Sequence, residues 1–321
     1  MNILINKNRL WKKLEKMSKI GPGKNGGNNR QALTYEDSLA RKLFVSWCER
    51  SNLKVSIDEM GNIFGEREGK NGNDLPVYMG SHLDTQPTGG KFDGVLGVLG
   101  ALEVIDTLND LKIETKRPIV VVNWTNEEGS RFSPPMMSSG VFAGIYTKDW
   151  AYNKKDKDNI KFIDDLKKNG MIGNETVGKR KMHCFFELHI EQGPILENEE
   201  KEIGIVTRGQ GLIWIKFSLN GQEAHSGTTP MNYRKNAGLG FIKIYDFIHK
   251  TAMKNFPEAV ATVGNCNFYP NSPNIIPGKV DFIADIRSPS EKKLKQMEKD
   301  ILKNSKNIAS ELNLSLYYNK I

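Results

Sequence analysis

Apolar and polar positions in the first part of this 321-residue chain switch between helical and strand-like spacing. Leu10, Leu14 and Met17 form an apolar stripe on a basic segment and predict a helix there. A second helix is expected from Thr34, because Thr-Tyr-Glu-Asp resembles a capping box with a shorter acid at its last position. Short apolar runs predict strands at residues 55–57, 63–65, 77–81, 119–123 and 185–189.

This alternation of strands and helices predicts an α/β fold, a sheet with helices on its faces and its chemistry at the strand ends. A helix is expected after Asp93, where glycine at every third position lets the backbone pack closely on the sheet. These glycines, Gly94, Gly97 and Gly100, lack the GxGxxG spacing and the following GK[ST] of a phosphate-binding loop, so we disfavour that alternative. Residues 148–178 are polar and predict a loop with one short helix.

The rhythm of the chain changes at about residue 209. The predicted order from there is strand 212–219, helix 236–253, strands 260–268 and 280–286, helix 291–312 and strand 314–318. This β-α-β-β-α-β order is the ferredoxin-like pattern. We therefore predict two domains, over residues 1–208 and 209–321.

The formal net charge is +8, from 46 Lys and Arg against 38 Asp and Glu. The lysines are interleaved with acids and form no basic stripe with aromatic partners, which predicts a solvated surface and no nucleic-acid partner. No apolar run approaches the roughly 20 residues of a membrane span and no signal-peptide core is present, so we expect a soluble, cytoplasmic protein without a membrane partner. Cys48, Cys184 and Cys266 are far apart in no CxxC pair, and we expect reduced, mostly buried thiols.

Candidate chemistry concentrates in residues 80–94, Gly-Ser-His-Leu-Asp-Thr-Gln-Pro-Thr-Gly-Gly-Lys-Phe-Asp-Gly. His82 and Asp84 are two apart, so on a strand they point to the same side, and Asp93 follows a glycine-rich turn. An imidazole, a carboxylate behind it and a second carboxylate on a loop are the donors that a divalent metal site needs. Two further clusters fit this scheme, Asn-Glu-Glu-Gly-Ser-Arg-Phe at 126–132 and His-Ile-Glu-Gln-Gly-Pro at 189–194.

Together these runs resemble the M20-type metal-dependent amidohydrolases, in particular the hydantoinase/carbamoylase family of N-carbamoyl-L-amino-acid hydrolases, ureidopropionases and allantoate amidohydrolases. The resemblance continues through Ala-His-Ser-Gly-Thr-Thr-Pro-Met at 224–231, Asn-Ile-Ile-Pro-Gly at 274–278 and Asp-Ile-Arg at 285–287. It implies a zinc-exopeptidase-like catalytic sheet with flanking helices, in which residues 1–208 are the metal-binding catalytic domain. Residues 209–321 are then an inserted ferredoxin-like lid and dimerisation domain, so a homodimer is expected.

In such relatives the chain returns from the lid to complete the catalytic sheet, and the returning segment carries the last metal-binding histidine. Here no histidine lies beyond His249. We therefore expect that the C-terminal part of the catalytic domain is missing, through a fragment or a truncated gene product, or that the chain departs from the family mechanism.

The resemblance implies two divalent ions in a complete subunit, and donors of this kind suit Zn, Mn, Co or Ni. His82 and His189 are each expected to give a nitrogen to one ion. Asp93 is expected to bridge both ions, and Glu128 to bind the second. The Asp84 carboxylate is expected to accept the other N–H of His82, which would fix the tautomer of the ring. His189 also disfavours an M20 peptidase, because peptidase relatives generally carry a carboxylate at that position.

Glu127 is the expected general base, which takes a proton from the attacking water and passes it to the leaving nitrogen. Adjacent acids on an extended chain point in opposite directions, so the turn at Gly129 is expected to give Glu127 and Glu128 separate tasks. His225, in the lid, resembles the histidine that stabilises the tetrahedral oxyanion across the dimer interface. The other implied substrate contacts, an amide and two lid residues that grip a carboxylate, are Gln192, Asn274 and Arg287.

The predicted activity is hydrolysis of the linear ureido bond of an N-carbamoyl-L-amino acid, a small anionic substrate, to the amino acid, carbon dioxide and ammonia. The segments at 131–136 and 140–144 favour a carbamoylase or ureidopropionase over an allantoate amidohydrolase, which stays an alternative. A truncated, catalytically impaired dimerising remnant is a second alternative, and it would bind one ion weakly or none. Arg131 is expected to hold its loop by a salt bridge, while Arg234 fits an anion contact or a lid salt bridge equally.

Overall fold

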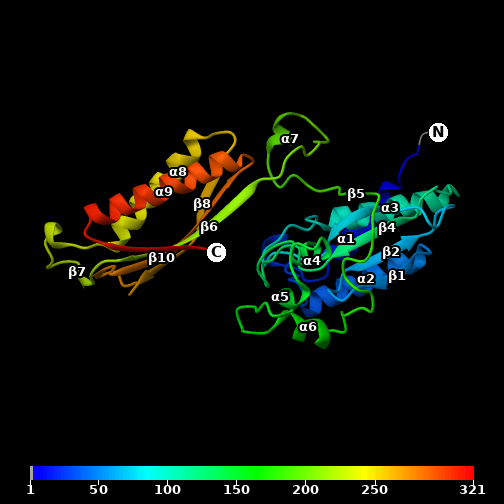
Figure 1. Cartoon of the computed structure of the whole chain (residues 1–321), viewed down its shortest axis with the longest axis horizontal. Helices are drawn as coiled ribbons and strands as arrows, with labels where there is room; N and C mark the ends of the chain where they lie inside the picture. The colour runs from blue at the N-terminus through cyan, green and yellow to red at the C-terminus, as the bar shows by residue number, and fades with distance from the viewer. Residues whose placement is uncertain (1–2) are drawn as a thin grey trace. The chain divides into compact units, whose positions relative to one another are not determined.

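The computed structural model describes residues 3–321, which form two compact units, one ending at Glu202 and the other beginning at Ile203 (Figure 1). The sequence placed this division at residues 208 and 209, within the same exposed connecting stretch. Each unit has its own hydrophobic core, so each has the character of a domain.

The first unit is built on a five-stranded sheet of order β1-β2-β4-β3-β5. Its strands are β1 (Lys54–Ile57), β2 (Ile63–Arg67), β3 (Val77–His82), β4 (Ile119–Trp124) and β5 (Cys184–Phe186). β3 runs parallel to β4 and β5, whereas β2 is antiparallel to β4 and β1. All six residues of β4 are buried, which explains its continuous apolar run, since a central strand covered on both faces needs no polar alternation.

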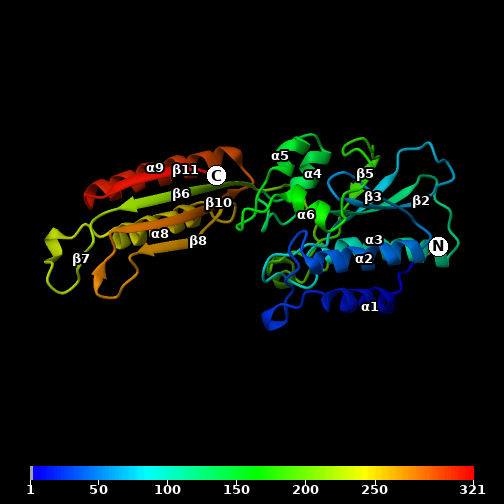
Figure 2. The same ribbon diagram turned by 90° about the horizontal axis from the view of Figure 1, so that it is seen from below.

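Three long helices lie on one side of this sheet: α2 (Tyr35–Arg50) and α3 (Val95–Asp110) pack on its face, and α1 (Lys7–Ser18) packs against α3, as Figure 2 shows. Thr34 caps α2 as its sequence predicted, because its hydroxyl accepts the Asp37 N–H. Gly97 lets α3 approach β3 closely, since a Cβ there would lie 2.7 Å from that of Ser81. On the other face Phe64, Tyr78, Val120, Val122 and Trp124 form a separate apolar cluster with Phe142.

Shorter elements complete the first unit, and several differ from the prediction. They are η1 (Lys24–Gly26), α4 (Met137–Phe142), α5 (Lys148–Tyr152), α6 (Phe162–Lys168) and α7 (Ile195–Asn198). The expectation of one short helix in 148–178 was wrong, since α5 and α6 both lie there; helices this short bury too few residues to produce a clear period. The strand predicted to reach His189 ends at Phe186, because its ladder with β3 stops at Met79.

The second unit is a four-stranded antiparallel sheet with two helices on one face. Its main elements are β6 (Gly211–Asn220), α8 (Ala237–Lys254), β8 (Val260–Tyr269), β10 (Lys279–Ser288), α9 (Glu291–Glu311) and β11 (Ser315–Lys320). The strand order β11-β6-β10-β8 is that of the predicted ferredoxin-like pattern. Even-numbered residues of β10 are buried beneath the helices, and odd-numbered residues lie on the face without helices.

A small two-stranded ribbon, which the sequence did not predict, extends this unit. It pairs β7 (Ala224–His225) with β9 (Ile275–Ile276), and the turn η2 (Met231–Tyr233) follows β7. Two-residue strands leave no periodic signal, so only the fold identifies them.

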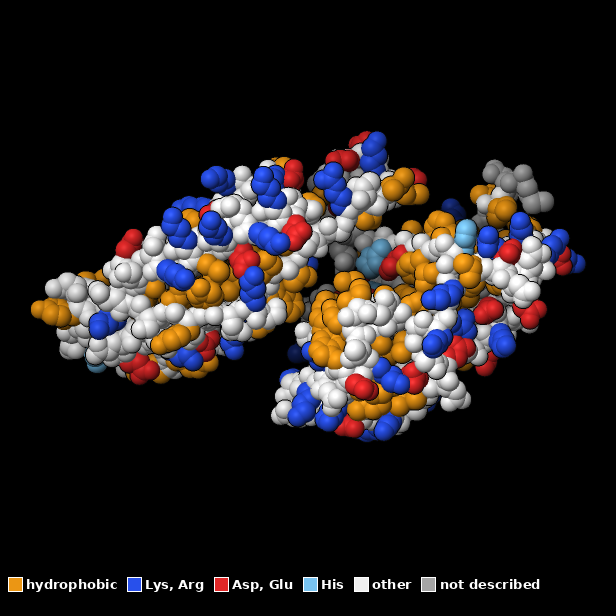
Figure 3. All heavy atoms as spheres, viewed as in Figure 1, with side chains coloured by type: hydrophobic (Ala, Val, Ile, Leu, Met, Phe, Trp, Pro, Cys, Tyr) orange, Lys and Arg blue, Asp and Glu red, His pale blue; other side chains and the backbone are white. Residues whose placement is uncertain are grey.

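The surface carries mixed charges, and the cysteines differ in burial from the expectation. Figure 3 shows Lys and Arg side chains interspersed with acidic and neutral ones on the visible face. Within residues 3–321 no helix is both long and apolar enough to cross a membrane. All three cysteines are free; Cys48 is buried, and burial raises its pKa to about 12, whereas Cys184 and Cys266 are half-buried, contrary to the expectation for most thiols.

Candidate metal centre

Three neighbouring strands bring the predicted ligands to one edge of the first sheet. His82 is the last residue of β3, and the Glu127–Glu128 pair follows the end of β4. His189 lies three residues beyond the end of β5. Because β3, β4 and β5 are parallel, their carboxyl ends meet at the same edge, which is where ligands bind in open α/β sheets.

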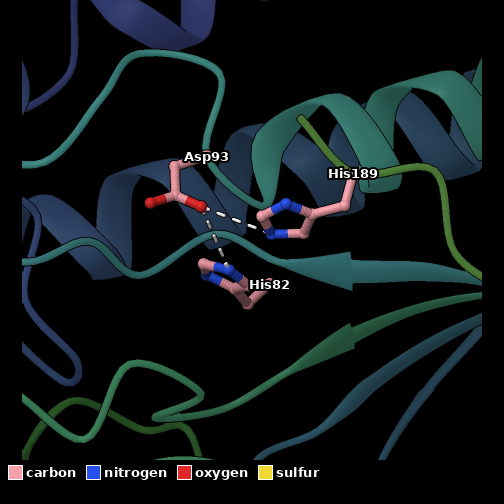
Figure 4. A group of neighbouring side chains, drawn as sticks. All are labelled: His82, Asp93 and His189. Carbon is pink, nitrogen blue, oxygen red and sulfur yellow. Dashed lines mark ion pairs between the residues drawn. The ribbon is translucent and has the colours of Figure 1, made fainter. Parts of the chain in front are cut away.

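His82, Asp93 and His189 come together in one cluster, whose candidate ligand atoms all lie within 4.8 Å of one another. The Asp93 carboxylate stands between the two rings, with Oδ1 3.9 Å from His82 Nε2 and 3.3 Å from His189 Nε2 (Figure 4). His82 and Asp93 are buried, while the His189 side chain keeps 32% of its surface exposed. The cluster is therefore closed on one side and accessible on the other.

Both histidines turn Nε2 towards Asp93, because a backbone carbonyl binds Nδ1 of each ring. His82 Nδ1 lies 2.9 Å from the backbone carbonyl of Asp84, and His189 Nδ1 lies 2.8 Å from that of Ile190. A carbonyl oxygen can only accept, so each neutral ring carries its proton on Nδ1 and turns the Nε2 lone pair towards Asp93. Two imidazole lone pairs converging on a carboxylate oxygen form an arrangement that a cation stabilises.

Gly94 shapes the floor of this cluster. It has φ +66°, and a Cβ there would lie 2.4 Å from His82 Nε2. The turn that carries Asp93 into α3 therefore requires a residue that tolerates the left-handed region and leaves room for the imidazole. The sequence suggested close packing for this glycine but not its contact with a ligand ring.

Asp84 acts differently from the sequence-based expectation. Its backbone carbonyl, not its carboxylate, accepts the His82 N–H, and the nearest carboxylate oxygen is 3.9 Å from Nδ1. The carboxylate instead accepts the backbone N–H groups of Glu127 and Glu128, each at 3.2 Å. Burial raises the pKa of Asp84 to about 6, against the lowering effect of His82. Asp84 thus joins the end of β3 to the turn after β4.

That turn separates the two adjacent glutamates, as expected. Asn126 and Gly129 flank the pair and both have positive φ, 54° and 62°. Glu127 Oε2 reaches to 3.4 Å from His82 Nε2, whereas Glu128 Oε2 accepts a hydrogen bond of 3.0 Å from Gln86. Burial raises the pKa of both glutamates, partly offset by His82 for Glu127 and by Gln86 for Glu128.

Glu128 lies outside the three-residue cluster, but its Oε1 atom is buried and lacks a hydrogen-bond partner among the described residues. A buried carboxylate oxygen without a partner is unfavourable unless a proton or a cation compensates it. Gln86, which sequence reasoning missed, lies two residues after Asp84, and this spacing was the only available signal.

One more polar side chain touches the cluster, and another lies near Glu127. Gln192, predicted to contact substrate, instead donates its side-chain amide to Asp93 Oδ2, and its backbone has φ +57°. The Ser81 hydroxyl donates to Glu187, whose negative charge raises the pKa of Glu127. Glu187 was missed by sequence reasoning, although it lies two residues before His189, the spacing that shares one side of a strand.

The buried guanidinium of Arg30 holds the chain next to Asp84 in place. The Arg30 side chain is fully buried and donates from Nε to the Leu83 carbonyl and from Nη1 to the Ile20 carbonyl, both at 2.8 Å. Its backbone N–H donates to Thr85 Oγ1 at 2.7 Å. Arg30 thereby fixes the chain on both sides of Asp84, a role that the sequence did not indicate.

In the second unit, His225 and Asn274 lie together on the β7–β9 ribbon. The Ser226 N–H donates to the Asn274 carbonyl at 3.0 Å. His225 Nδ1 accepts the N–H groups of Gly227 and Thr228 at 3.0 and 3.3 Å, so the ring carries its proton on Nε2. His225 is thus presented as a hydrogen-bond donor.

Arg287 lies at the other end of β10 from this ribbon, which extends past Lys279, as Figure 1 shows. Lys279 and Arg287 are eight residues apart on β10. That distance is about 26 Å at the usual strand rise. Asn274 and Arg287 of one chain are therefore too far apart to grip the same carboxylate together, and the contact of each residue with the substrate stays a prediction.

Arg131 and Arg234 each hold a loop in place. Arg131 pairs with Asp156 and Asp165, as predicted, and also donates to the Ala32 carbonyl at 3.0 Å. Arg234 donates to the backbone carbonyls of Thr229 and Ser226 at 3.0 and 2.7 Å and so braces the loop after His225. Within residues 3–321 Arg234 forms no salt bridge, and its contact with an anion stays a prediction.

The donor set of the first unit fits a divalent cation. Two Nε2 lone pairs, the Asp93 carboxylate between them and the unpartnered Glu128 oxygen are borderline and hard donors on separate elements. Burial raises the pKa of the acids around them, and the negative charges of Asp84 and Glu127 outweigh burial and leave the pKa of His82 above its ordinary 6.5. An added positive charge would relieve both effects.

Comparison with known proteins identifies the family. The model of peptidase family M20/M25/M40 matches residues 78–313. An N-carbamoyl-L-amino-acid amidohydrolase of Rhizobium meliloti is 57% identical over 296 residues, which cover 92% of this chain and 71% of that protein. One from Geobacillus stearothermophilus is 36% identical over 317 residues, 98% of this chain and 77% of that protein.

A solved structure supports the same conclusion. The amidase of the hydantoinase/carbamoylase family from Burkholderia multivorans superposes with a TM-score of 0.90 at 46% identity, covering 99% of this chain and 78% of that one. Sequence and structure therefore agree with the resemblance that the motifs indicated. This chain belongs to the M20 peptidase family, and within it to the hydantoinase/carbamoylase amidases.

Proposed function

We propose that this protein hydrolyses the linear ureido bond of an N-carbamoyl-L-amino acid. One water is consumed, the bond between the ureido carbon and the amino-acid nitrogen breaks, and the carbamic acid released decomposes to carbon dioxide and ammonia. The observation that carries the proposal is the convergence of two histidine Nε2 atoms on Asp93, beside the half-buried Glu127. The likeness to N-carbamoyl-L-amino-acid amidohydrolases supplies the substrate class.

Two divalent ions in a complete subunit are part of the proposal. His82 and His189 would hold one ion, Asp93 would contact both, and Glu128 would contribute its unpartnered oxygen to the second. Zn, Mn, Co and Ni all suit these donors. The ions supply Lewis-acid chemistry at the ureido group and at the attacking water.

Glu127 is the proposed general base. It takes a proton from the attacking water on its carboxylate and donates it to the departing amino-acid nitrogen. The raised pKa of Glu127, caused mainly by burial, suits a group that must both accept and release a proton near neutral pH. Asp84 and Gln86 keep the neighbouring backbone and Glu128 in place, so Glu127 alone is free to exchange the proton.

We propose that His225 donates a hydrogen bond from its Nε2–H to the oxyanion, and that Asn274 acts beside it. Arg287 binds the substrate carboxylate, because a planar guanidinium offers two parallel donors to it. One chain carries Arg287 and the β7–β9 ribbon at opposite ends of β10, so His225 and Asn274 would reach the substrate from a second copy. This makes the second unit a lid and a dimerisation domain.

The apolar residues that α8 leaves exposed support such a dimer. Leu239, Ile242 and Met253 are each at least 41% exposed, and β8 is an edge strand of its sheet. An exposed edge next to apolar side chains is a ready surface for pairing. Sedimentation at several concentrations tests this part, and we expect a dimer. A monomer at every concentration would contradict it.

The activity is tested directly by incubating the protein with Mn²⁺ or Zn²⁺ and a panel of N-carbamoyl-L-amino acids, with allantoate and a dipeptide as competing classes. We expect ammonia and the free amino acid, in equal amounts, from at least one carbamoyl amino acid. Ammonia from allantoate alone would favour the allantoate amidohydrolase alternative. Release of products from none of these compounds would reject the proposal.

Metal content separates an enzyme from a catalytically impaired remnant. Protein dialysed against Zn²⁺ and then against metal-free buffer is analysed for bound metal. Two tightly bound ions per chain are expected of the enzyme, and one weakly bound ion or none of the remnant. Glu127→Gln is the matched control, since it should keep the metal and lose the activity.

A further inference from the structure

Asp285 holds the guanidinium of Arg287 on the helix-free face of the second sheet. Arg287 Nε donates to Asp285 Oδ1 at 2.9 Å and to Oδ2 at 3.2 Å, and Nη2 donates to Oδ2 at 2.7 Å. The two residues are two apart on β10 and so share one side of the strand. The bonds therefore engage the Nε–Nη2 edge of the guanidinium.

The remaining edge of the guanidinium is available to a ligand. Within residues 3–321 no acceptor is hydrogen-bonded to Arg287 Nη1, and the side chain keeps 43% of its surface exposed. A guanidinium has five N–H donors in a fixed plane, so engaging one edge fixes the direction of the Nη1–Nη2 edge. That edge has the spacing to meet two carboxylate oxygens.

The sheet in turn holds Asp285 in place. Asp285 lies on β10, which pairs with β6 on one side and with β8 on the other, and Trp214 is its partner in the β6–β10 ladder. Burial raises the pKa of Asp285, but the hydrogen-bonded Arg287 guanidinium and the neighbouring Trp214 outweigh burial and leave the pKa below its ordinary value. The carboxylate is thus a fixed, ionised anchor on a rigid strand.

We propose that Asp285 is a positioning residue for substrate recognition, which orients Arg287 so that its Nη1–Nη2 edge binds the substrate carboxylate. The inference rests on the proposed function. Because Asp285 balances the charge of Arg287, recognition depends on the direction of the two donors more than on net charge. Loss of Asp285 leaves the guanidinium in place but free to rotate, so it weakens binding of the carboxylate and spares the chemical step.

The same strand offers a matched control. Lys279 and Asp281 are also two apart on β10, lie on the same face and form an ion pair of 2.9 Å. As for Asp285, the pKa of Asp281 lies below its ordinary value, since hydrogen bonds and nearby lysines outweigh burial. Asp281→Asn therefore removes a comparable charge pair without touching Arg287.

The test compares Asp285→Asn with Asp281→Asn in steady-state hydrolysis of an N-carbamoyl-L-amino acid and of its carboxamide, which lacks the carboxylate. We expect Asp285→Asn to raise KM for the acid about tenfold or more, with kcat within about threefold of wild type. For the carboxamide, Asp285→Asn and wild type should have equal kcat/KM. Asp281→Asn should have the kinetic constants of wild type with both the acid and the carboxamide. Asp285→Glu, which keeps the carboxylate, should raise KM for the acid less than Asp285→Asn does.

An unchanged KM for Asp285→Asn, or an equal rise for Asp281→Asn, would overturn the proposal. A second readout does not need turnover. Hydrogen exchange of the Arg287 Nε–H, followed by ¹⁵N NMR, should be slow in the wild type and in Asp281→Asn and fast in Asp285→Asn. If wild-type protein hydrolyses no carbamoyl amino acid, the proposed function fails, and equal exchange rates in all three proteins would independently reject the anchoring of Arg287.

Discussion

The acids of the candidate metal centre in the first unit and those on β10 in the second unit have opposite surroundings. In the first unit, Asp93 faces two imidazole lone pairs and Glu128 keeps a buried oxygen without a partner among the described residues. In the second unit, Asp281 and Asp285 each have a cationic neighbour on the same strand. The first arrangement is incomplete until a cation joins it, whereas the second is complete and serves to direct a side chain.

This difference in charge balance indicates how each unit contributes to the proposed reaction. A site with surplus negative charge attracts ions and then uses their charge, so its energetics depend on metal binding. A balanced pair contributes little free energy by itself but fixes geometry. Variants that remove an acid of the metal centre should therefore have large effects on metal binding and activity, whereas variants that remove Asp281 or Asp285 should have small effects on stability.

The largest effect is expected for Asp93→Ala. It removes the carboxylate between His82 and His189, so bound metal should fall to less than one ion per chain and activity below detection. A loss of well over about 100-fold in affinity is expected, because even indirect partners of metal ligands change affinity by 10- to 100-fold. Titration calorimetry with Zn²⁺ measures it, with Asp246→Ala, an exposed acid on α8, as control. Unaltered metal binding in Asp93→Ala would refute the proposed centre.

Glu127→Gln is expected to separate chemistry from metal binding. The amide keeps the shape of the carboxylate but cannot accept the proton, so kcat should fall by about 100- to 10,000-fold. Metal content should stay at the wild-type level, because Glu127 is not assigned as a ligand. Loss of metal together with activity would instead make Glu127 a metal ligand and would contradict its assignment as the general base alone.

Gly94→Ala should distort the centre without removing a donor. Its φ is +66°, and the new Cβ would collide with the His82 ring. The left-handed backbone alone costs roughly 1–2 kcal/mol, and displacement of His82 should lower Zn²⁺ affinity in addition. Gly170→Ala is the matched control, with φ +62° and nothing within 4 Å of the Cβ, so it should lose stability but not affinity. Equal Zn²⁺ affinity in both variants would disprove the contact.

The smallest effect is expected for the pH dependence of the Asp285 pair. The folded-state pKa of Asp285 lies below its ordinary value of 3.8, so its ionisation stabilises the fold above that pH and the contribution is lost as the pH falls through the folded-state pKa. Asp285→Asn should therefore lower the free energy of unfolding by about 1 kcal/mol near neutral pH and by less in acid. Urea denaturation at about pH 7 and about pH 3 checks this. A deficit that grows in acid would contradict the sign.

Much of the fold followed from local patterns. The stripe at Leu10, Leu14 and Met17 became α1, and Thr34 capped α2 through its hydroxyl. These features depend on residues three or four positions apart, so periodicity and capping chemistry are sufficient to predict them. The short helices α5 and α6 were not resolved as two, because their burial comes from distant residues such as Met60 and Phe132.

The sequence by itself determined which residue types stand at the strand ends, and therefore the family and the candidate ligands His82, Asp93, Glu128 and His189. Only the tertiary structure decided which partner each side chain takes. In the fold, the His82 N–H donates to a backbone carbonyl, and the Asp84 carboxylate accepts the backbone N–H of Glu127. Arg287 lies at the end of β10 that is far from Asn274. The physical reason is that hydrogen-bond partners are chosen by distances of about 3 Å between segments far apart in the chain, which residue order does not encode.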